Sequence, residues 1–272
     1  MTVRSTCAIV LKVADHGEAD ELVTCYSREL GRVTGLANGA KKSTRRFVNK
    51  LEEFSLLQLF CRPPRSASGL YIIAEAELLR AHLSLRTVYP RYVAAAYLCE
   101  LTLRFTRDND PDKRIFTLLL WALNSLDRGE AVAKTAALFH LLLLDAAGYR
   151  PELHQCGHCG QAVGPGQSFL LLPGNGSLLC SLCQPNAAAA GSRLSVQTLK
   201  FLAQAQRAGQ ERLNRLQMPA RGAWEALKAL HRYTLHLLQQ DIHSWKSLCA
   251  LHAEPSRIPR LASRQRGTNN AT

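Results

Sequence analysis

The chain has 272 residues, of which 47% are hydrophobic and 20% charged, so it can form sizeable cores and is not disordered as a whole. Its formal net charge of +13 favours polyanionic partners such as nucleic acids. Residues 1–80, 81–150, 151–190 and 191–272 carry net charges of +3, +2, −1 and +9, which places most of the excess in the last third. No export signal and no apolar run of about 18 residues is visible, which predicts a cytoplasmic protein with no membrane partner.

Residues 1–80 have the pattern of a small β-barrel. Two runs rich in apolar and β-branched residues, Ser5–Val13 and Leu22–Leu30, flank a polar turn around Gly17. The glycine-rich stretch GRVTGLANGA is typical of a bent strand, and FSLLQLFC and GLYIIAEAEL flank a turn rich in Pro and Ser. Short strands with frequent turns predict an OB-fold barrel, a five-stranded class that binds oligonucleotides.

A basic segment follows the third predicted strand. It holds five cations and no acid within ten residues, at Lys41, Lys42, Arg45, Arg46 and Lys50. With Ser43, Thr44 and nearby backbone amides, these cations could hold nucleic-acid phosphates. Phe47, in the middle of the segment, either stacks on a base or belongs to the barrel core. The alternative for the whole segment is a solvated basic loop.

Residues 81–150 and 191–254 are predicted to form an α-helical domain. One helix begins near Pro90, a second is capped by Asp110, and a third ends at Gly148. Ser195 is expected to cap a helix that runs to Leu216, and one long last helix is expected from Ala220 to Leu251. Residues 255–272, rich in Arg, Ser and Asn, are predicted to form a disordered basic tail.

Residues 151–190 contain two C-x-x-C pairs separated by 20 residues. Each pair presents two thiolates from one tight turn, so the four predicted ligands are Cys156, Cys159, Cys180 and Cys183. Four thiolates leave no open coordination position, which predicts one structural Zn²⁺ per chain in an inserted zinc ribbon. His154 and His158 lie near enough to substitute as ligands, and a pair of redox C-x-x-C motifs is the alternative.

Motifs for catalysis are missing from the sequence. There is no GxxxxGK[ST] loop and no HExxH pair, and the acidic stretch DNDPD is better explained by the start of a helix. His231, His236 and His243 are expected on one helix, where surface histidines are common. The chain is therefore predicted not to be an enzyme.

The order of these parts resembles the RecO family of bacterial recombination mediators and DNA-repair proteins. The likeness lies in AIVL, LANGAKKSTRRF, YLCELTLRFT, FTLLLWALNSL, ALFHLLLLDAAGYRPELHQCGHCG, CSLC and RYTLHLLQQDIHSWKSL, and it covers the chain up to about Pro255. The resemblance implies an α+β multidomain protein: an N-terminal OB-fold, a helical domain and a zinc-binding insert. It also implies a location in the bacterial cytoplasm, at the nucleoid.

The resemblance further implies activities and partners. RecO proteins bind single- and double-stranded DNA, anneal complementary strands, and act with RecR to help RecA load onto DNA coated by single-strand-binding protein (SSB), without hydrolysing nucleotides. The basic excess near the C-terminus then predicts a second DNA surface, or a dock for the acidic C-terminal tail of SSB. The candidate residues for this second basic surface are Arg207, Arg212, Arg215, Lys228 and Arg232.

Three other functions remain open from the residues. An RNA-binding module built from an OB-fold and a zinc ribbon would prefer structured RNA to single-stranded DNA. A metal-dependent nuclease or transferase would show magnesium-dependent cleavage. A zinc-stabilised protein adaptor would not bind DNA at moderate salt.

Overall fold

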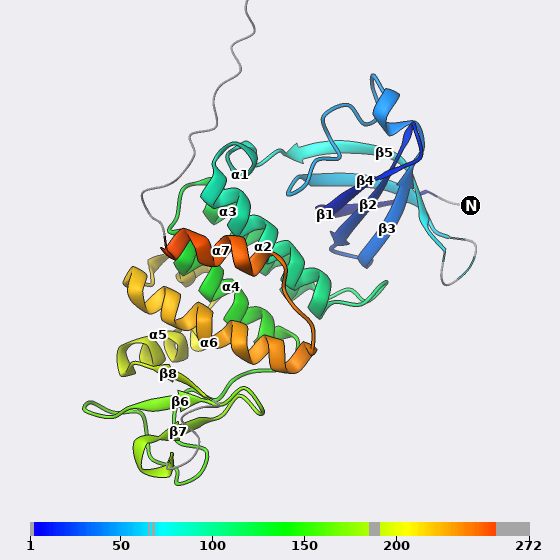
Figure 1. The fold of residues 1–272 in the computed structure, drawn as a ribbon. Coiled ribbons are helices and arrows are strands. Elements are labelled where there is room, and N and C mark those ends of the chain that lie inside the picture. The colour runs from blue at the N-terminus through cyan, green and yellow to red at the C-terminus, as the bar shows by residue number, and fades with distance from the viewer. Residues whose placement is uncertain (1–2, 65, 67–68, 185–190, 254–272) are drawn as a thin grey trace, which may run out of the picture.

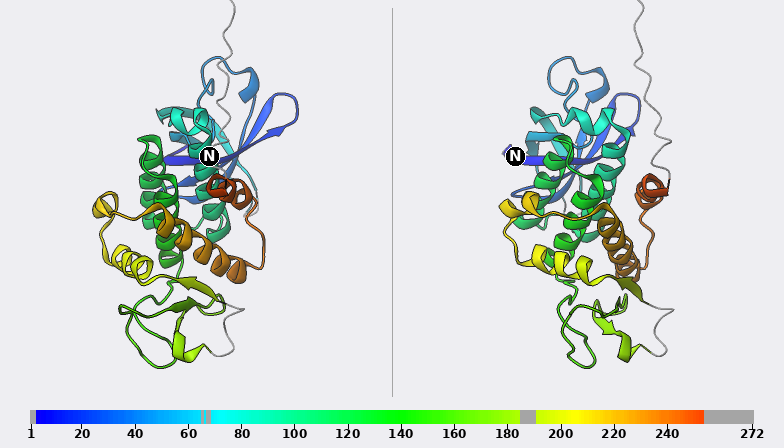
Figure 2. Two further views of the ribbon diagram at one scale, coloured as in Figure 1. Left: turned by 60° about the vertical axis from the view of Figure 1, so that its left-hand side comes forward. Right: turned by 90° about the vertical axis from the view of Figure 1, so that its left-hand side faces the viewer.

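The computed structural model describes residues 3–64, 66, 69–184 and 191–253 (Figure 1). The predicted tail at 255–272 lies outside the described residues. A β-barrel forms one end of the molecule, a small three-stranded sheet forms the other, and a group of helices lies between them (Figures 1 and 2). This arrangement confirms the predicted fold class of a barrel followed by a helical region with an insert.

The N-terminal barrel is closed by five strands in the order β1-β2-β3-β5-β4. The strands are β1 (Arg4–His16), β2 (Asp20–Ser27), β3 (Gly31–Ala37), β4 (Leu56–Arg62) and β5 (Tyr71–Arg80). All neighbours are antiparallel except β3 and β5, which are parallel and pair only at Gly35–Tyr71 and Leu36–Ile72. A five-stranded barrel with this connectivity is the predicted OB-fold.

Side chains that alternate between the two faces of the strands fill the interior of the barrel. In β3 every second residue is buried, as expected for a strand with one face on a core. Gly35 is required at the short β3–β5 seam, because a Cβ there would come within 2.7 Å of the Ile73 side chain. The short helix η1 (Ala40–Lys42) and residues 43–55 then connect β3 to β4 across one end of the barrel.

Seven α-helices follow within the described residues. They are α1 (Leu83–Thr87), α2 (Tyr89–Phe105), α3 (Lys113–Asp127), α4 (Val132–Ala146), α5 (Val196–Arg207), α6 (Ala220–Leu238) and α7 (Ser244–Ala253). Helix α4 is buried on nearly all sides, which explains its almost continuous run of apolar residues. The other helices contribute buried residues to the same hydrophobic core, one each from α1 and α7 and several from each of the others.

Three details of the predicted helices were wrong. The side chain that caps α3 is Asp112, which accepts a hydrogen bond from the Arg114 amide, and not Asp110. Ser195 caps α5 as predicted, but that helix ends at Arg207 and a separate 3-10 helix, η3 (Gln210–Arg215), follows. The single long last helix is in fact two, α6 and α7, separated by the left-handed residue Gln239.

The barrel and the helices share one interface. Buried barrel residues such as Ile9, Tyr26 and Phe54 belong to the same hydrophobic cluster as the helical core. Arg32 on β3 donates hydrogen bonds to the Asp108 carboxylate and the Leu103 carbonyl, both at 2.6 Å. The Asn109 amide donates to the Arg32 carbonyl, so the α2–α3 loop lies along β3 beyond the point where β5 leaves it.

The insert between α4 and α5 forms a sheet of three short strands in the order β7-β6-β8. Strands β6 (Phe169–Leu171) and β7 (Leu178–Cys180) are the predicted pair, and η2 (Ser181–Cys183) follows them. The third strand, β8 (Ser192–Leu194), comes from residues that the sequence assigned to the helical domain. Among the described residues, no helix has the length and apolar character needed to cross a membrane.

Candidate metal centre and nucleic-acid surfaces

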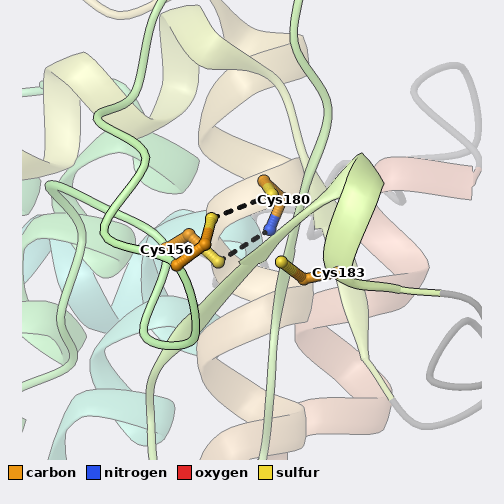
Figure 3. Close-up of side chains that lie close together, drawn as sticks. Cys156, Cys180 and Cys183 are labelled. Carbon is orange, nitrogen blue, oxygen red and sulfur yellow. Dashed lines mark hydrogen bonds between the residues drawn. The ribbon is translucent and has the colours of Figure 1, made fainter.

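The four cysteines of the insert converge on one point. The turn after Leu153 supplies Cys156 and Cys159, while the end of β7 and helix η2 supply Cys180 and Cys183. Their sulfur atoms all lie within 4.8 Å of one another. Figure 3 shows Cys156, Cys180 and Cys183 turned toward a common centre. The C-x-x-C spacing thus predicted the correct set of residues.

The spacing of the sulfur atoms fits a tetrahedral metal site. With metal–sulfur bonds of about 2.3 Å, as for zinc, two ligands of a tetrahedron are about 3.8 Å apart. The Sγ atoms of Cys159 and Cys180 are separated by 3.7 Å, and all nine cysteines are free. A disulfide would bring these atoms to about 2.0 Å, so the redox alternative does not match the geometry. These four residues could hold a metal ion, and neither His154 nor His158 belongs to the set.

Backbone amides stabilise the negatively charged thiolate form of Cys156. Burial alone would raise the pKa of the Cys156 thiol, but hydrogen bonds from the amides of Cys159, Cys180 and His158 outweigh it and lower the pKa to about 6. The Cys180 amide contacts the Cys156 sulfur at 3.4 Å. Hydrogen bonding with the Cys159 thiol instead raises the pKa of Cys183 to about 12. Four thiolates this close repel one another, so ionising all four requires a cation between them.

The insert is tied to the helices through its buried half. Cys156 and Cys180 are buried with Phe169 and Leu178 in the main hydrophobic cluster, whereas Cys159 is exposed. The Gly157 amide donates to the Leu178 carbonyl at 2.8 Å and joins the two cysteine pairs directly. The cysteine cluster therefore lies at the edge of the hydrophobic core, with its buried half packed among residues of the insert.

The basic segment lies on the η1 helix and the loop that follows it. Gly39 adopts a left-handed conformation, and its amide donates to the Asp20 carboxylate at 2.7 Å, which fixes where the segment starts. Three of its five cations hold the loop in shape. Lys41 pairs with Asp15 at 3.0 Å, Arg46 donates to the Asn38 carbonyl, and Lys50 donates to the carbonyls of Arg45 and Arg46.

The two remaining cations are differently placed. Lys42 and Arg45 are exposed, and neither has an ion pair or hydrogen bond from its side chain to any residue that the structure describes. Their charges are therefore not neutralised by a neighbouring acid. They are the members of the segment best placed to meet a phosphate without disturbing the loop.

Phe47 is a core residue, so of the two roles that the sequence left open the structure supports a place in the barrel core and not base stacking. Only 3% of it is exposed, and it belongs to the barrel cluster with Val23, Leu51 and Leu59. The Arg46 guanidinium lies over its ring at 5.0 Å and covers it further. Phe47 thus attaches the basic segment to the hydrophobic core of the barrel.

The five residues predicted as a second basic surface lie on three elements with different neighbours. Arg207 ends α5 beside the His154 ring, and Arg232 on α6 donates to the Gly191 carbonyl, so both adjoin the insert. Arg212 and Arg215 belong to η3, which packs on α3 through Asn214. Lys228 is exposed on α6. All five are exposed, but these contacts divide them into separate groups.

Sequence reasoning missed several residues beside the basic segment. A hollow of about 560 Å³ separates the loop from the start of the helical domain, and Arg86 and Tyr92 line its far wall. Tyr92 is 41% exposed, although it lies in a helix with a buried face. No local pattern distinguishes this tyrosine from a core residue, because its exposure depends on how α2 meets the barrel.

These observations define a multidomain OB-fold protein with a four-cysteine cluster that could hold a metal ion and with an exposed basic loop. Two family models match nearly all of the chain: "Recombination protein O N terminal" at residues 1–82 and "Recombination protein O C terminal" at residues 86–246. The chain belongs to the RecO family of DNA repair proteins, as its sequence motifs indicated.

Individual relatives agree with this assignment, and each of the following is named DNA repair protein RecO. The chain is 36% identical over 230 residues to the protein of an Anaeromyxobacter species, covering 85% of this chain and 89% of the relative. It is 33% identical over 242 residues to that of a Roseiflexus species, covering 89% and 83%. It is 29% identical over 245 residues to that of Syntrophus aciditrophicus, covering 89% and 94%.

Proposed function

We propose that this protein is a non-catalytic DNA-repair and recombination mediator. It binds single- and double-stranded DNA, anneals complementary strands, and with RecR helps RecA to load onto single-stranded DNA that SSB covers. The observation that carries the proposal is the basic loop on an OB barrel, with Lys42 and Arg45 exposed and unneutralised, in a chain of the RecO family. Annealing requires screening of the repulsion between two strands, which exposed cations supply.

The metal in this proposal is one structural Zn²⁺ bound by the four cysteines. The all-sulfur donor set and the 3.7 Å sulfur separation support zinc, which favours tetrahedral thiolate sites. The bound ion would supply no reaction chemistry, because four protein ligands leave no position for a substrate. It would neutralise the thiolates and hold the insert against α6.

The partners follow from charge. The exposed cations of the helical domain, at Arg207, Arg212, Arg215, Lys228 and Arg232, would receive a second DNA segment or the acidic tail of SSB. A hollow between α5 and the start of α6, lined by Phe201, Met218 and Arg221, offers an apolar floor with a cation for such a tail. Crosslinking of a tail peptide outside the helical domain would contradict this docking site. A bacterial cytoplasm, at the nucleoid, is the location that these partners imply.

The first experiment is annealing of two complementary labelled oligonucleotides by the purified protein, without ATP, across a salt series. Acceleration that fades as salt rises is the expected result, because phosphate contacts weaken with salt. Absence of acceleration, with single strands unbound, would favour a zinc-stabilised protein adaptor. Magnesium-dependent strand cleavage would instead indicate an enzyme.

A further inference from the structure

A hollow in two adjoining parts, which share two lining residues, lies at the junction between the barrel and the helical domain. The first part, about 560 Å³, lies between the basic loop and the α1–α2 region, with Val48, Lys50 and Arg86 in its walls. The second part, about 500 Å³, lies between β1 and α2 and is lined by Lys12, Arg104 and the start of α7. Tyr92 and Glu53 line both parts, so the two parts meet at these side chains.

Tyr92 is held rigidly at this meeting point. Its ring packs edge-on against Phe54, with centroids 5.6 Å apart and an angle of 72° between the planes. Phe54 is 1% exposed, so one edge of the tyrosine ring rests on the core. The rest of its ring, with 41% of the residue exposed, faces the hollow. A fixed, exposed aromatic ring in a hollow is the usual platform for stacking an unpaired base.

The first part of the hollow offers hydrogen-bond acceptors for bases, and two exposed cations of the basic loop lie outside it. Glu21 and Glu53 are half-buried in it, and burial raises the pKa of both carboxyl groups. Lys41, Lys50 and Arg86 line the same part, so it carries charges of both signs. The carboxyl groups can accept hydrogen bonds from the amino groups of bases. Lys42 and Arg45, the exposed cations of the same loop, do not line the hollow. A strand can therefore place its phosphates on these two cations and turn its bases inward.

Arg86 also lines this part of the hollow. Its Nη1 atom is buried and pairs with the Glu52 carboxylate at 3.7 Å. This ion pair belongs to the wall of the hollow, so Tyr92 is the side chain of this region best placed to contact a base.

We propose that this hollow binds the unpaired bases of single-stranded DNA, with Tyr92 as the stacking residue. The inference rests on the proposed function and adds to it a base-binding site that distinguishes single strands from duplex. In a duplex the bases are stacked and paired, so only phosphates and the basic loop make contact. The hollow would then select DNA that is ready to be annealed.

The test compares the full-length protein with Tyr92→Ala and Tyr92→Phe variants. Affinities for a labelled single-stranded oligonucleotide and for a duplex are measured by anisotropy over a salt series. Tyr92→Ala should weaken single-strand binding by roughly 5- to 150-fold, the effect of losing one aromatic–base stack, and leave the salt slope unchanged. Tyr92→Phe keeps the ring and should stay within about twofold of wild type. Duplex affinity should not change in either variant.

Tyr149→Ala is the matched control. Tyr149 is also exposed, at 46%, and its ring also packs on a phenylalanine, Phe105 at 6.0 Å, but it lines a different hollow. A 2-aminopurine base in the strand provides a second readout, since stacking on Tyr92 should quench its fluorescence with the wild-type protein and not with Tyr92→Ala.

Equal behaviour of Tyr92→Ala and Tyr149→Ala would overturn the inference. So would an equal loss of single-strand and duplex affinity, or unchanged 2-aminopurine fluorescence on binding. Failure of the wild-type protein to bind any DNA would instead overturn the proposed function as a whole, and it would be seen before any substitution is made.

Discussion

The salt dependence of DNA binding tests the basic loop directly. We consider a Lys42→Ala/Arg45→Ala double variant, because these two cations are exposed and make no side-chain contact with the described residues. The variant keeps the ion pair of Lys41 and the hydrogen bonds of Arg46 and Lys50, so the shape of the loop is retained. Its free energy of unfolding should match wild type within about 0.5 kcal/mol.

The size of the effect follows from counterion release. Each phosphate contact contributes about 0.7 to the slope of log affinity against log salt on a single strand, so two lost contacts lower the slope by about 1.4. Between about 50 and about 200 mM salt, that change makes the advantage of wild type over the variant shrink by roughly sevenfold. On a duplex, with about 0.9 per contact, the corresponding factor is roughly twelvefold.

The assay is equilibrium anisotropy at five or six salt concentrations, with an Arg212→Ala/Arg215→Ala double variant as control. Those two arginines are also exposed and remove the same formal charge, but they lie on η3, in the proposed second basic surface. The comparison therefore tells which of the two basic surfaces binds the phosphates of the labelled strand. If the loop variant has the same slope of log affinity against log salt as wild type, Lys42 and Arg45 do not contact phosphates. A reduced slope in the control alone would place the phosphate contacts on the helical domain.

Three further predictions concern stability. Elemental analysis should find about one zinc per chain in the wild-type protein. The Cys156→Ser variant should lose the zinc and unfold the insert, whereas the Cys249→Ser variant, which changes a cysteine outside the cluster, should keep the zinc. A metal-free insert that resists proteolysis would contradict the prediction. Glu100 accepts hydrogen bonds from the backbone amides of His243 and Ser244 at the start of α7. The Glu100→Ala variant should therefore be less stable by about 1–2 kcal/mol and show faster hydrogen exchange of the amides in α7. Unchanged exchange rates in α7 would count against this role of Glu100. Burial lowers the pKa of His231 to about 4, so the neutral side chain contributes stability that is present above pH ~6.5 and is lost as the pH falls toward 4. The His231→Phe variant keeps the ring that stacks on Trp245, and its stability should fall less over this pH range. An equal fall in both proteins would disprove the prediction.

The parts of the structure that local chemistry determines were predictable from sequence. The C-x-x-C spacing identified the four cysteines that the fold brings together, and the glycines and alternating strands identified the barrel. The role of the cysteines as metal ligands stays a prediction. Ser195 was a correct cap because a serine before an apolar period satisfies the first amides of a helix. The cationic segment was also correctly placed on an exposed loop.

Features that depend on distant contacts were not predictable. The break between α6 and α7 contains neither glycine nor proline, and the apolar period continues through it. The break is stabilised by Glu100, which lies far away on α2 and caps α7. In the same way, nothing local shows that Phe47 is buried or that Tyr92 is exposed. Both depend on how the loop and α2 lie against the barrel.

The α2–α3 loop beside β3 has a consequence for any attempt to divide this protein. Strand β5 pairs with only two residues of β3, and Asp108 and Asn109 cover the strand near Arg32. A Cβ on Gly31 would overlap the Asp110 backbone, so the cover fits closely. A fragment cut after β5 would leave the polar backbone of β3 uncovered, and a bare strand edge is a template for self-association. The barrel and the helices are accordingly expected to melt in one transition and to work as one inseparable unit.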